Sequence, residues 1–134
     1  MKRKTVSSLK KQCWALFSRY VRLRDCLLTT DSYEYAECVS CHRTLPINEL
    51  DAGHFIPKKN ANYFSERGVN AQCQSCNRFH SGRQLEYRRE IIRRYGEGVD
   101  EELEEEARQE KRFTIKELEK LKASLQEKLR RIAP

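Results

Sequence analysis

Two Cys-x-x-Cys pairs, Cys38–Cys41 and Cys73–Cys76, are separated by 31 residues and constrain this chain more than any other feature. Each pair closes a tight turn that points two thiolates at one centre. Two such turns supply the four sulfurs of a closed tetrahedral Zn²⁺ site. A hydrophobic core built only from the central segment of this 134-residue chain would be small. A metal ion bound there would add the stability that such a core lacks. The spacing therefore predicts a structural zinc ion.

The same cysteines admit two other interpretations. Disulfides are one, but the chain has six cysteines and no apolar leader, so we expect a reducing, intracellular setting, the cytoplasm. A redox Cys-x-x-Cys is the other, yet such a motif sits at the start of a helix in a βαβ pattern and needs no second pair. Cys13 and Cys26 lie on an amphipathic stretch and are expected to be buried apolar residues rather than ligands.

Charge is distributed unevenly along the chain, which carries a net charge of +7. Residues 1–24 contain eight Lys or Arg and no acid, and residues 78–94 contain six Arg against two Glu. Residues 97–110 reverse the sign with eight acids and one Arg, and the Glu run at 101–106 within them is most simply a solvated face, or else a mimic of DNA phosphates. No apolar run approaches the roughly 20 residues that span a bilayer. These features favour a nucleic-acid partner and exclude a membrane.

Hydrophobic periodicity predicts helices at both ends of the chain. Apolar residues recur at intervals of three and four from Ser7 to Leu28, and again after a capping box at Thr114-Ile115-Lys116-Glu117. Between them, short runs broken by proline and glycine favour strands. The expected elements of the middle are strands at 42–45 and 51–56, a loop at 57–63, a helix from Asn77 or Ser81 to Tyr95, and a short acidic helix at 99–108.

These elements predict one α+β domain in three parts. Residues 1–30 form a basic N-terminal helix, residues 33–96 a zinc-bound core, and residues 97–134 a C-terminal helical extension. Within the core, the order of Cys-x-x-Cys turn, strands, Cys-x-x-Cys turn and helix is the plan of a treble-clef zinc fold. The apolar stripe of the last helix is expected to pack on the first helix, with dimerisation through it as the alternative.

The segment between the cysteine pairs carries the groups that phosphodiester hydrolysis requires: a base, a cation and a grip on phosphate. His54 is the candidate base, since imidazole titrates near neutral pH. Asp51 and Asn77 offer hard oxygen atoms suited to Mg²⁺ or Mn²⁺, and His80, one helical turn after Asn77, is a further candidate ligand. The candidate phosphate-binding residues are Lys58, Lys59, Arg67, Arg78 and Arg83.

Simpler roles are open for each of these residues. His54 follows a glycine and fits a hydrogen-bonded strand residue, Asp51 fits a turn, and Asn77 fits a helix cap. The charged residues fit a solvated surface. Their combination favours the catalytic interpretation.

The motifs resemble those of the Rap/NinG family of phage recombination endonucleases. The likeness is carried by Ala52-Gly53-His54-Phe55 between the cysteine pairs, by Cys76-Asn77 and by Ser81-Gly82. It extends to Leu16-Phe17-Ser18 and Val21-Arg22-Leu23-Arg24-Asp25 near the start and to Phe113-Thr114-Ile115-Lys116-Glu117-Leu118 near the end.

The resemblance implies an HNH-like, ββα-metal nuclease that cuts branched DNA such as Holliday junctions and D-loops in the host cytoplasm. It implies His54 as base, Asn77 as ligand of a catalytic Mg²⁺ or Mn²⁺, and no small-molecule cofactor. Two cuts per junction imply a homodimer. The chain departs from many HNH enzymes at Gly53, where they have an acid, and the asparagine that orients the base has no clear match, although Asn70 lies in the right region. The alternatives are a non-catalytic zinc module that binds nucleic acid and, less favoured, a thiol oxidoreductase.

Overall fold

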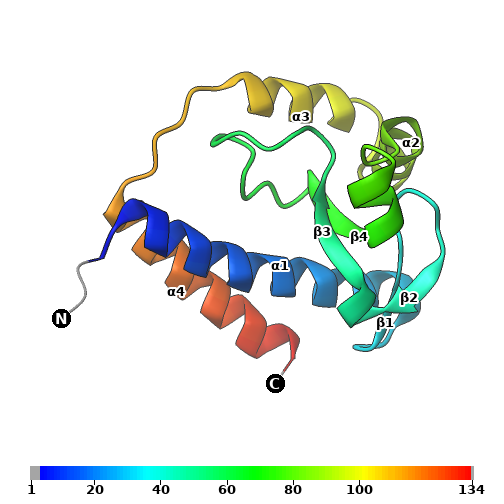
Figure 1. Cartoon of the computed structure of the whole chain (residues 1–134), viewed down its shortest axis with the longest axis horizontal. Coiled ribbons are helices and arrows are strands. Elements are labelled where there is room, and N and C mark those ends of the chain that lie inside the picture. The colour runs from blue at the N-terminus through cyan, green and yellow to red at the C-terminus, as the bar shows by residue number, and fades with distance from the viewer. Residues whose placement is uncertain (1–3, 134) are drawn as a thin grey trace.

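A long N-terminal helix, α1 (Val6–Thr30), runs the length of the molecule and contacts both halves of it (Figure 1). The structure is a computed structural model that describes residues 4–133. Thr5 opens α1 with a capping box to Ser8, and Asp31 ends it in the left-handed conformation with φ 55°. The helix predicted from Ser7 to Leu28 is confirmed.

The C-terminal helix α4 (Ile115–Ile132) packs along α1, and the two helices lie side by side in Figure 1. Thr114 and Glu117 form the predicted capping box. Leu118 and Leu125 of α4 are buried in a cluster with apolar residues of α1, and the Cys13 thiol donates a hydrogen bond to the Leu118 carbonyl at 3.3 Å. The predicted packing of the last helix on the first is therefore confirmed, as is the burial of Cys13 and Cys26.

Two small antiparallel sheets lie between these helices and the rest of the chain. The first pairs β1 (Tyr35–Glu37) with β2 (Thr44–Pro46), and a 3₁₀ turn at 47–49 leads into the second, β3 (Leu50–His54) with β4 (Val69–Cys73). The predicted strand at 42–45 starts later because His42 has φ 64°, which no strand accommodates. The strand β4 was not predicted, although Val69-Asn70-Ala71-Gln72-Cys73 alternates between apolar and polar residues; all five are buried, because Asn70 and Gln72 find hydrogen-bond partners inside the fold.

Beyond β4 the chain forms a single π-helical turn, η2 (Ser75–Phe79), and then α2 (Gln84–Tyr95) and α3 (Val99–Arg108). The helix expected from Asn77 or Ser81 begins only at Gln84, because Ser81, Gly82 and Arg83 all have positive φ. The acidic helix at 99–108 is confirmed. Within residues 4–133 no helix is long and apolar enough to cross a membrane.

The acidic helix α3 packs on α2 through Val99 and Leu103. Its outer carboxylates meet cations of the core: Arg88 bridges Asp100 at 2.6 Å and Glu104 at 2.9 Å. The architecture is α+β, as predicted, and the acidic stretch is a packed, partly neutralised helix of the domain.

A buried charge cluster joins α1 to β4. Asp25 is 0% exposed, receives two hydrogen bonds from Arg24, and accepts the backbone N–H of Ala71 at 2.7 Å. Arg24 also donates to the Val69 carbonyl and to Asn70. These bonds orient α1 against the strand that ends at the second cysteine pair.

Replacing Asp25 with alanine is expected to destabilise the fold by about 3–5 kcal/mol, because Arg24 and the Ala71 N–H would lose their buried acceptor. Urea unfolding followed by circular dichroism measures this change. As a matched control, Glu127→Ala removes an exposed helix-surface pair with Arg130 and should leave the free energy of unfolding nearly unchanged. Equal stability of the two variants would contradict the role assigned to Asp25.

Candidate metal centre and active-site cleft

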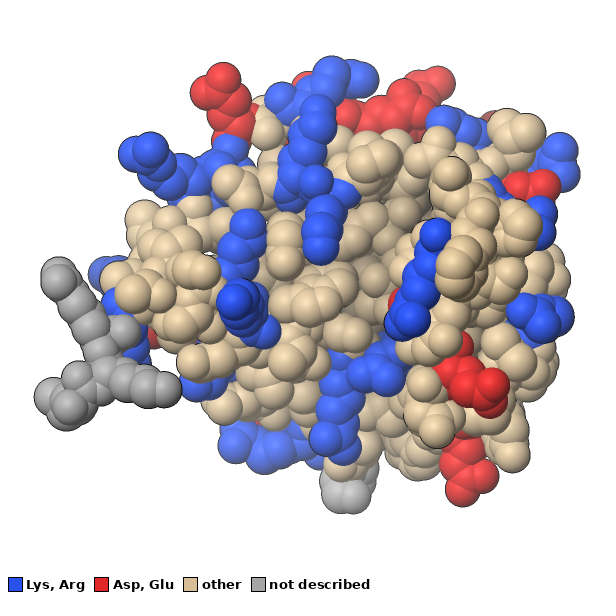
Figure 2. All heavy atoms as spheres, viewed as in Figure 1, with Lys and Arg blue, Asp and Glu red and all other residues tan. Residues whose placement is uncertain are grey.

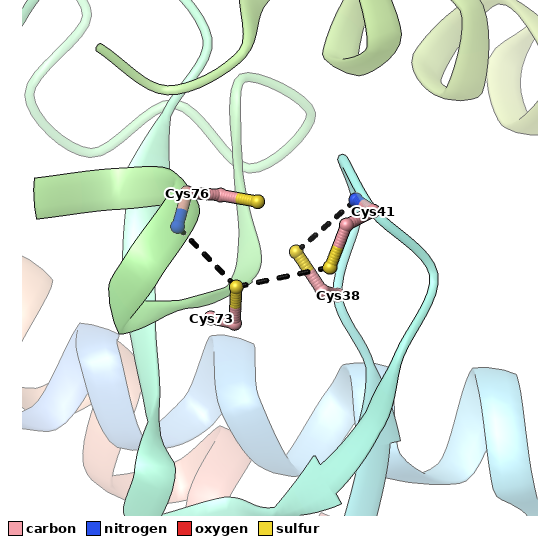
Figure 3. Close-up of side chains that lie close together, drawn as sticks. All are labelled: Cys38, Cys41, Cys73 and Cys76. Atoms are coloured by element: carbon pink, nitrogen blue, oxygen red, sulfur yellow. Dashed lines mark hydrogen bonds between the residues drawn. The ribbon is translucent and has the colours of Figure 1, made fainter. Parts of the chain in front are cut away.

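The four cysteines of the two Cys-x-x-Cys pairs converge on one point, where their Sγ atoms all lie within 4.8 Å of one another. Figure 3 shows two of them coming from the turn between β1 and β2, and two from the end of β4 and the start of η2. A tetrahedral ZnS₄ site with bonds of about 2.3 Å has S···S edges of about 3.8 Å. The Cys41 and Cys73 sulfurs are 3.8 Å apart, and all six cysteines are free, so the disulfide alternative is not the one formed.

Backbone amides donate hydrogen bonds to two of the four sulfurs. Backbone N–H groups of Ser40 and Cys41 donate to the Cys38 sulfur at 3.4 and 3.5 Å, and that of Cys76 donates to the Cys73 sulfur at 3.3 Å. Burial raises the pKa of Cys73, but hydrogen bonds from the Cys76 N–H and Arg43 outweigh it and lower the pKa to about 7. Burial raises the pKa of Cys38 and, together with the neighbouring sulfurs, that of Cys76. Four sulfurs this close cannot all be thiolates without a compensating cation, and a soft divalent ion such as Zn²⁺ fits that need.

Next to the cysteine cluster lies a cleft of about 770 Å³ between α1, β3 and the start of α2. It brings together Asp51, His54, Asn77, Lys58 and Arg78, all of them predicted site residues. Figure 2 shows Lys and Arg side chains across the middle of the face that it draws, with acidic side chains gathered towards the edges. The pairing of Leu50 with Cys73 places Asp51 beside the metal centre, and Asn77 directly follows Cys76.

Asp51 and Asn77 are in direct contact in the cleft. The Asn77 Nδ2 donates to Asp51 Oδ2 at 2.9 Å, while the Arg78 guanidinium holds both carboxylate oxygens at 3.0 and 2.9 Å. Burial opposes ionisation of Asp51, but the hydrogen bonds from Arg78 and Asn77 prevail and lower its pKa. The carboxylate is therefore charged at neutral pH, with an amide and a guanidinium on it.

His54 is half-buried at the end of β3. Its ring stacks on Trp14 of α1, with centroids 5.3 Å apart and planes 14° apart, and its Nε2 lies 3.0 Å from the Tyr63 carbonyl oxygen. Burial lowers the pKa of His54 and nearby Lys58 lowers it further, against the opposing effect of the Tyr63 carbonyl. The imidazole is thus kept neutral at pH 7.

Asn62 braces the loop that carries the Tyr63 carbonyl, and sequence reasoning missed it. It is 4% exposed; its Nδ2 donates to the Ile56 and Pro57 carbonyls, and its Oδ1 accepts the Lys59 N–H at 2.6 Å. Its position in a proline-bounded loop after the histidine strand was the available signal. Asn70, the residue considered for this role, lies instead in the buried cluster with Arg24, where it donates to the Tyr87 hydroxyl.

The other predicted residues lie outside the cleft. His80 is exposed and, with Arg83, lines a separate hollow at the start of α2. Arg67 pairs with Glu102 at 2.8 Å, and the exposed Lys59 contributes its backbone to the loop held by Asn62. The structure therefore gives these side chains no contact with Asp51, His54 or Asn77.

One helical face of α1 contributes residues to the cleft that sequence reasoning did not assign. Trp14, Ser18 and Arg22 recur every four residues and line it together. Arg22 donates to the Ser18 carbonyl, and its charge lies near Asp51. The signal was a second stripe on α1 with helical spacing, beside the apolar stripe that packs on α4. The remaining polar residues lining the cleft are Asn48, Gln74, Ser81 and Gln84.

The sequence of this chain is similar to those of known bacteriophage proteins. A family model described as "Bacteriophage Lambda NinG protein" matches residues 1–133. The protein ninG of Escherichia phage lambda is 38% identical over 95 residues, which cover 69% of this chain and 46% of the relative. The ninG proteins of Escherichia phage 933W and Salmonella phage P22 are 37% and 36% identical over the same lengths. The chain thus spans about half the length of these relatives, and no solved structure matches it.

Proposed function

The chain belongs to the NinG family of bacteriophage proteins, and on this premise we propose that it is a divalent-metal-dependent endonuclease that hydrolyses phosphodiester bonds in branched recombination intermediates. The observation that carries the proposal is the convergence of His54, Asp51 and Asn77 in one cation-lined cleft beside the four-cysteine cluster. Holliday junctions and D-loops, in the cytoplasm of the infected host, are the proposed substrates.

His54 is suited to act as the general base. A carbonyl oxygen only accepts hydrogen bonds, so the contact with Tyr63 assigns the proton to Nε2 and leaves a lone pair on Nδ1. Nδ1 would take a proton from the attacking water. The stacked Trp14 ring and the braced loop hold the imidazole in one orientation, which avoids reorganisation during the reaction.

Asp51 and Asn77 carry oxygen donors of the kind that Mg²⁺ or Mn²⁺ prefers. The Asn77 amide, whose nitrogen donates to Asp51, would turn over to present its oxygen to the ion. When bound, such an ion supplies positive charge to the developing phosphate oxyanion and the leaving oxygen. Arg78 now occupies the Asp51 carboxylate, but more than half of its side chain is exposed, at 54%. It would therefore exchange Asp51 for a DNA phosphate at little cost when an ion binds.

Lys58, Arg78 and Arg22 supply the proposed phosphate contacts in the cleft. Contacts of this kind position the DNA backbone without reading its sequence, and the affinity for DNA should fall steeply with salt.

For the core we propose a treble-clef, HNH-like class. Its parts are the Cys-x-x-Cys turn between β1 and β2, the β3–β4 hairpin, and the second Cys-x-x-Cys turn, which leads into η2 and α2. A homodimer is proposed because two cuts need two sites, and sedimentation velocity with and without junction DNA tests it.

A second candidate function is a non-catalytic zinc module that binds nucleic acid. The bidentate Arg78–Asp51 pair favours it, because that pair neutralises the one carboxylate beside Asn77. This alternative gives the neutral, oriented His54 no task.

The deciding experiment incubates the purified protein with a labelled four-way junction and Mg²⁺ or Mn²⁺, beside Asn77→Ala. We expect cleavage by the parent protein that requires added ion, and a loss of about 10²-fold or more in Asn77→Ala. Mn²⁺ binding, measured by electron paramagnetic resonance, should weaken in the same variant, while Lys59→Ala, outside the cleft, serves as control. Junction binding without cleavage under any ion condition would favour the zinc module.

A further inference from the structure

Two large apolar side chains stand in solvent beside the cleft. Phe79, at the end of η2, is 78% exposed, and Leu85, in the first turn of α2, is 69% exposed. They lie at the two ends of the four-residue connection 80–83, which we call the wedge loop. They are the two most exposed large hydrophobic residues among residues 4–133, and Leu28 comes next at 59%. Exposure of this size on one short loop suggests a binding surface.

Hydrogen bonds anchor the wedge loop. Ser81 and Arg83 have φ values of 51° and 46°, which are costly for residues with a side chain, whereas Gly82 adopts its φ of 80° without steric strain. The anchor is Gly82: its N–H donates to the Cys76 carbonyl at 2.8 Å, and its own carbonyl accepts Gln72 Nε2 at 2.7 Å and Ser40 Oγ at 2.9 Å. Cys76 and Ser40 belong to the two Cys-x-x-Cys turns, so the metal centre supports the loop directly.

The same loop forms one wall of the cleft. Ser81, Gly82 and Gln84 line the cleft, and Arg78, which precedes Phe79, holds Asp51 inside it. Phe79 and Leu85 are not among the residues that line the cleft. The loop thus places Phe79 and Leu85 on either side of a backbone segment that is anchored next to the proposed reaction site.

The chemistry of the surroundings selects the occupant. Arg78, Arg88, Arg93 and Arg94 are ion-paired, but Arg83 and Arg89 have no acidic partner among residues 4–133, and Lys58 and Arg22 add positive charge in the adjacent cleft. A partner that combines negative charge with flat apolar faces therefore fits this surface. A second copy of this chain would bring one basic surface against another, which like-charge repulsion opposes. DNA has both properties, but its base faces are accessible only where stacking is interrupted. Phenylalanine and leucine are residues that proteins insert at such steps.

We propose that Phe79 and Leu85 form a wedge that enters the interrupted base stack at a DNA branch point, and that this insertion selects branched over linear DNA. The proposal rests on the proposed function in assuming that the cleft binds DNA. Stacking is tolerant of sequence, so the wedge would recognise the shape of the branch.

The test compares binding of the parent protein and the double variant Phe79→Ala/Leu85→Ala to a four-way junction and a linear duplex, without added Mg²⁺ or Mn²⁺. From the usual strength of base–aromatic stacking, the variant should lose roughly 5- to 150-fold in junction affinity and stay within about two-fold on the linear duplex. A 2-aminopurine at the branch should brighten when the parent protein binds and not when the variant binds. Leu28→Ala, an exposed apolar residue at the far end of α1, is the matched control and should behave as the parent.

Three outcomes would overturn the wedge: an equal loss on both DNAs, a parent protein that does not brighten the probe, or a parent dimer that the double variant converts to monomer in sedimentation. Both residues are exposed, so the variant should fold, and its thermal unfolding checks this. The assay reports binding alone, which separates it from the proposed function. A wedge-dependent junction preference, with no cleavage in the separate assay that contains Mg²⁺ or Mn²⁺, supports the wedge and contradicts the nuclease. Cleavage in that assay, with no change of binding preference in the double variant, supports the nuclease and contradicts the wedge.

Discussion

Replacing His54 with alanine is expected to slow junction cleavage by about 10²–10⁴-fold while leaving junction affinity nearly unchanged. The loss follows because the imidazole is the one neutral base in the cleft, and its Nδ1 is free while Nε2 is held by the Tyr63 carbonyl. Affinity should survive, because Lys58, Arg78 and Arg22 remain in place. Single-turnover cleavage of a labelled junction measures the rate, and a filter or gel-shift titration measures the affinity.

The pH dependence adds a readout that a merely structural histidine would not move. Burial and Lys58 lower the pKa of His54, so the acid limb of the rate profile should have its midpoint below the usual value of about 6.5. Activity is then constant above that midpoint and falls as the pH drops through it. As the pH falls, His54 is protonated in the unfolded chain before it is protonated in the folded protein. The free energy of unfolding therefore also decreases as the pH falls below about 6.5.

Asn62→Ala is the companion variant, since it removes the brace of the loop and keeps the imidazole. We expect a smaller loss of rate, about 10-fold, with an altered His54 titration in NMR spectra. Undiminished cleavage by His54→Ala would remove this residue as the base, whatever the behaviour of Asn62→Ala.

Loss of the zinc ion is expected to unfold the core. Structural zinc contributes about 10–16 kcal/mol in small zinc domains, whereas a typical domain is stable by only about 5–15 kcal/mol. The ion would join the β1–β2 turn to the end of β4 and the start of η2, at the centre of a small hydrophobic cluster in which the four cysteines are a large share of the buried residues. A strong chelator, or Cys76→Ser, should therefore abolish the cooperative thermal transition of the core in circular dichroism.

Elemental analysis gives the stoichiometry, for which we expect one zinc per chain. Cys13→Ala is the matched control: it removes a buried cysteine of the α1–α4 interface and should keep the full zinc content. A protein purified without zinc that unfolds cooperatively, with or without chelator, would contradict the assignment of these four cysteines.

Features that depend on residues close together in the sequence could be predicted well. The helices α1, α3 and α4 followed from periodicity and capping, and the cysteine cluster from the spacing of its two pairs. Elements with a weak local signature were misjudged. Strand β4 alternates between apolar and polar residues over only five positions, and its polar members are buried by hydrogen bonds to distant residues, while the positive φ values before Gln84 delay α2 beyond its expected start. Both depend on neighbours from other parts of the chain.

In the candidate site, too, the sequence indicated which residues take part, and the fold determined their surroundings. Residue type and order alone determined the four thiolates and nominated His54, Asp51 and Asn77, because metal coordination and proton transfer demand particular atoms. Only the tertiary structure decided that Trp14 and the Tyr63 carbonyl orient the imidazole, that Arg78 covers Asp51, and that His80 and Arg67 stay outside the cleft. The reason is physical: stacking, ion pairing and burial act between side chains that the fold brings within a few ångströms, and separation along the chain carries no record of that closeness.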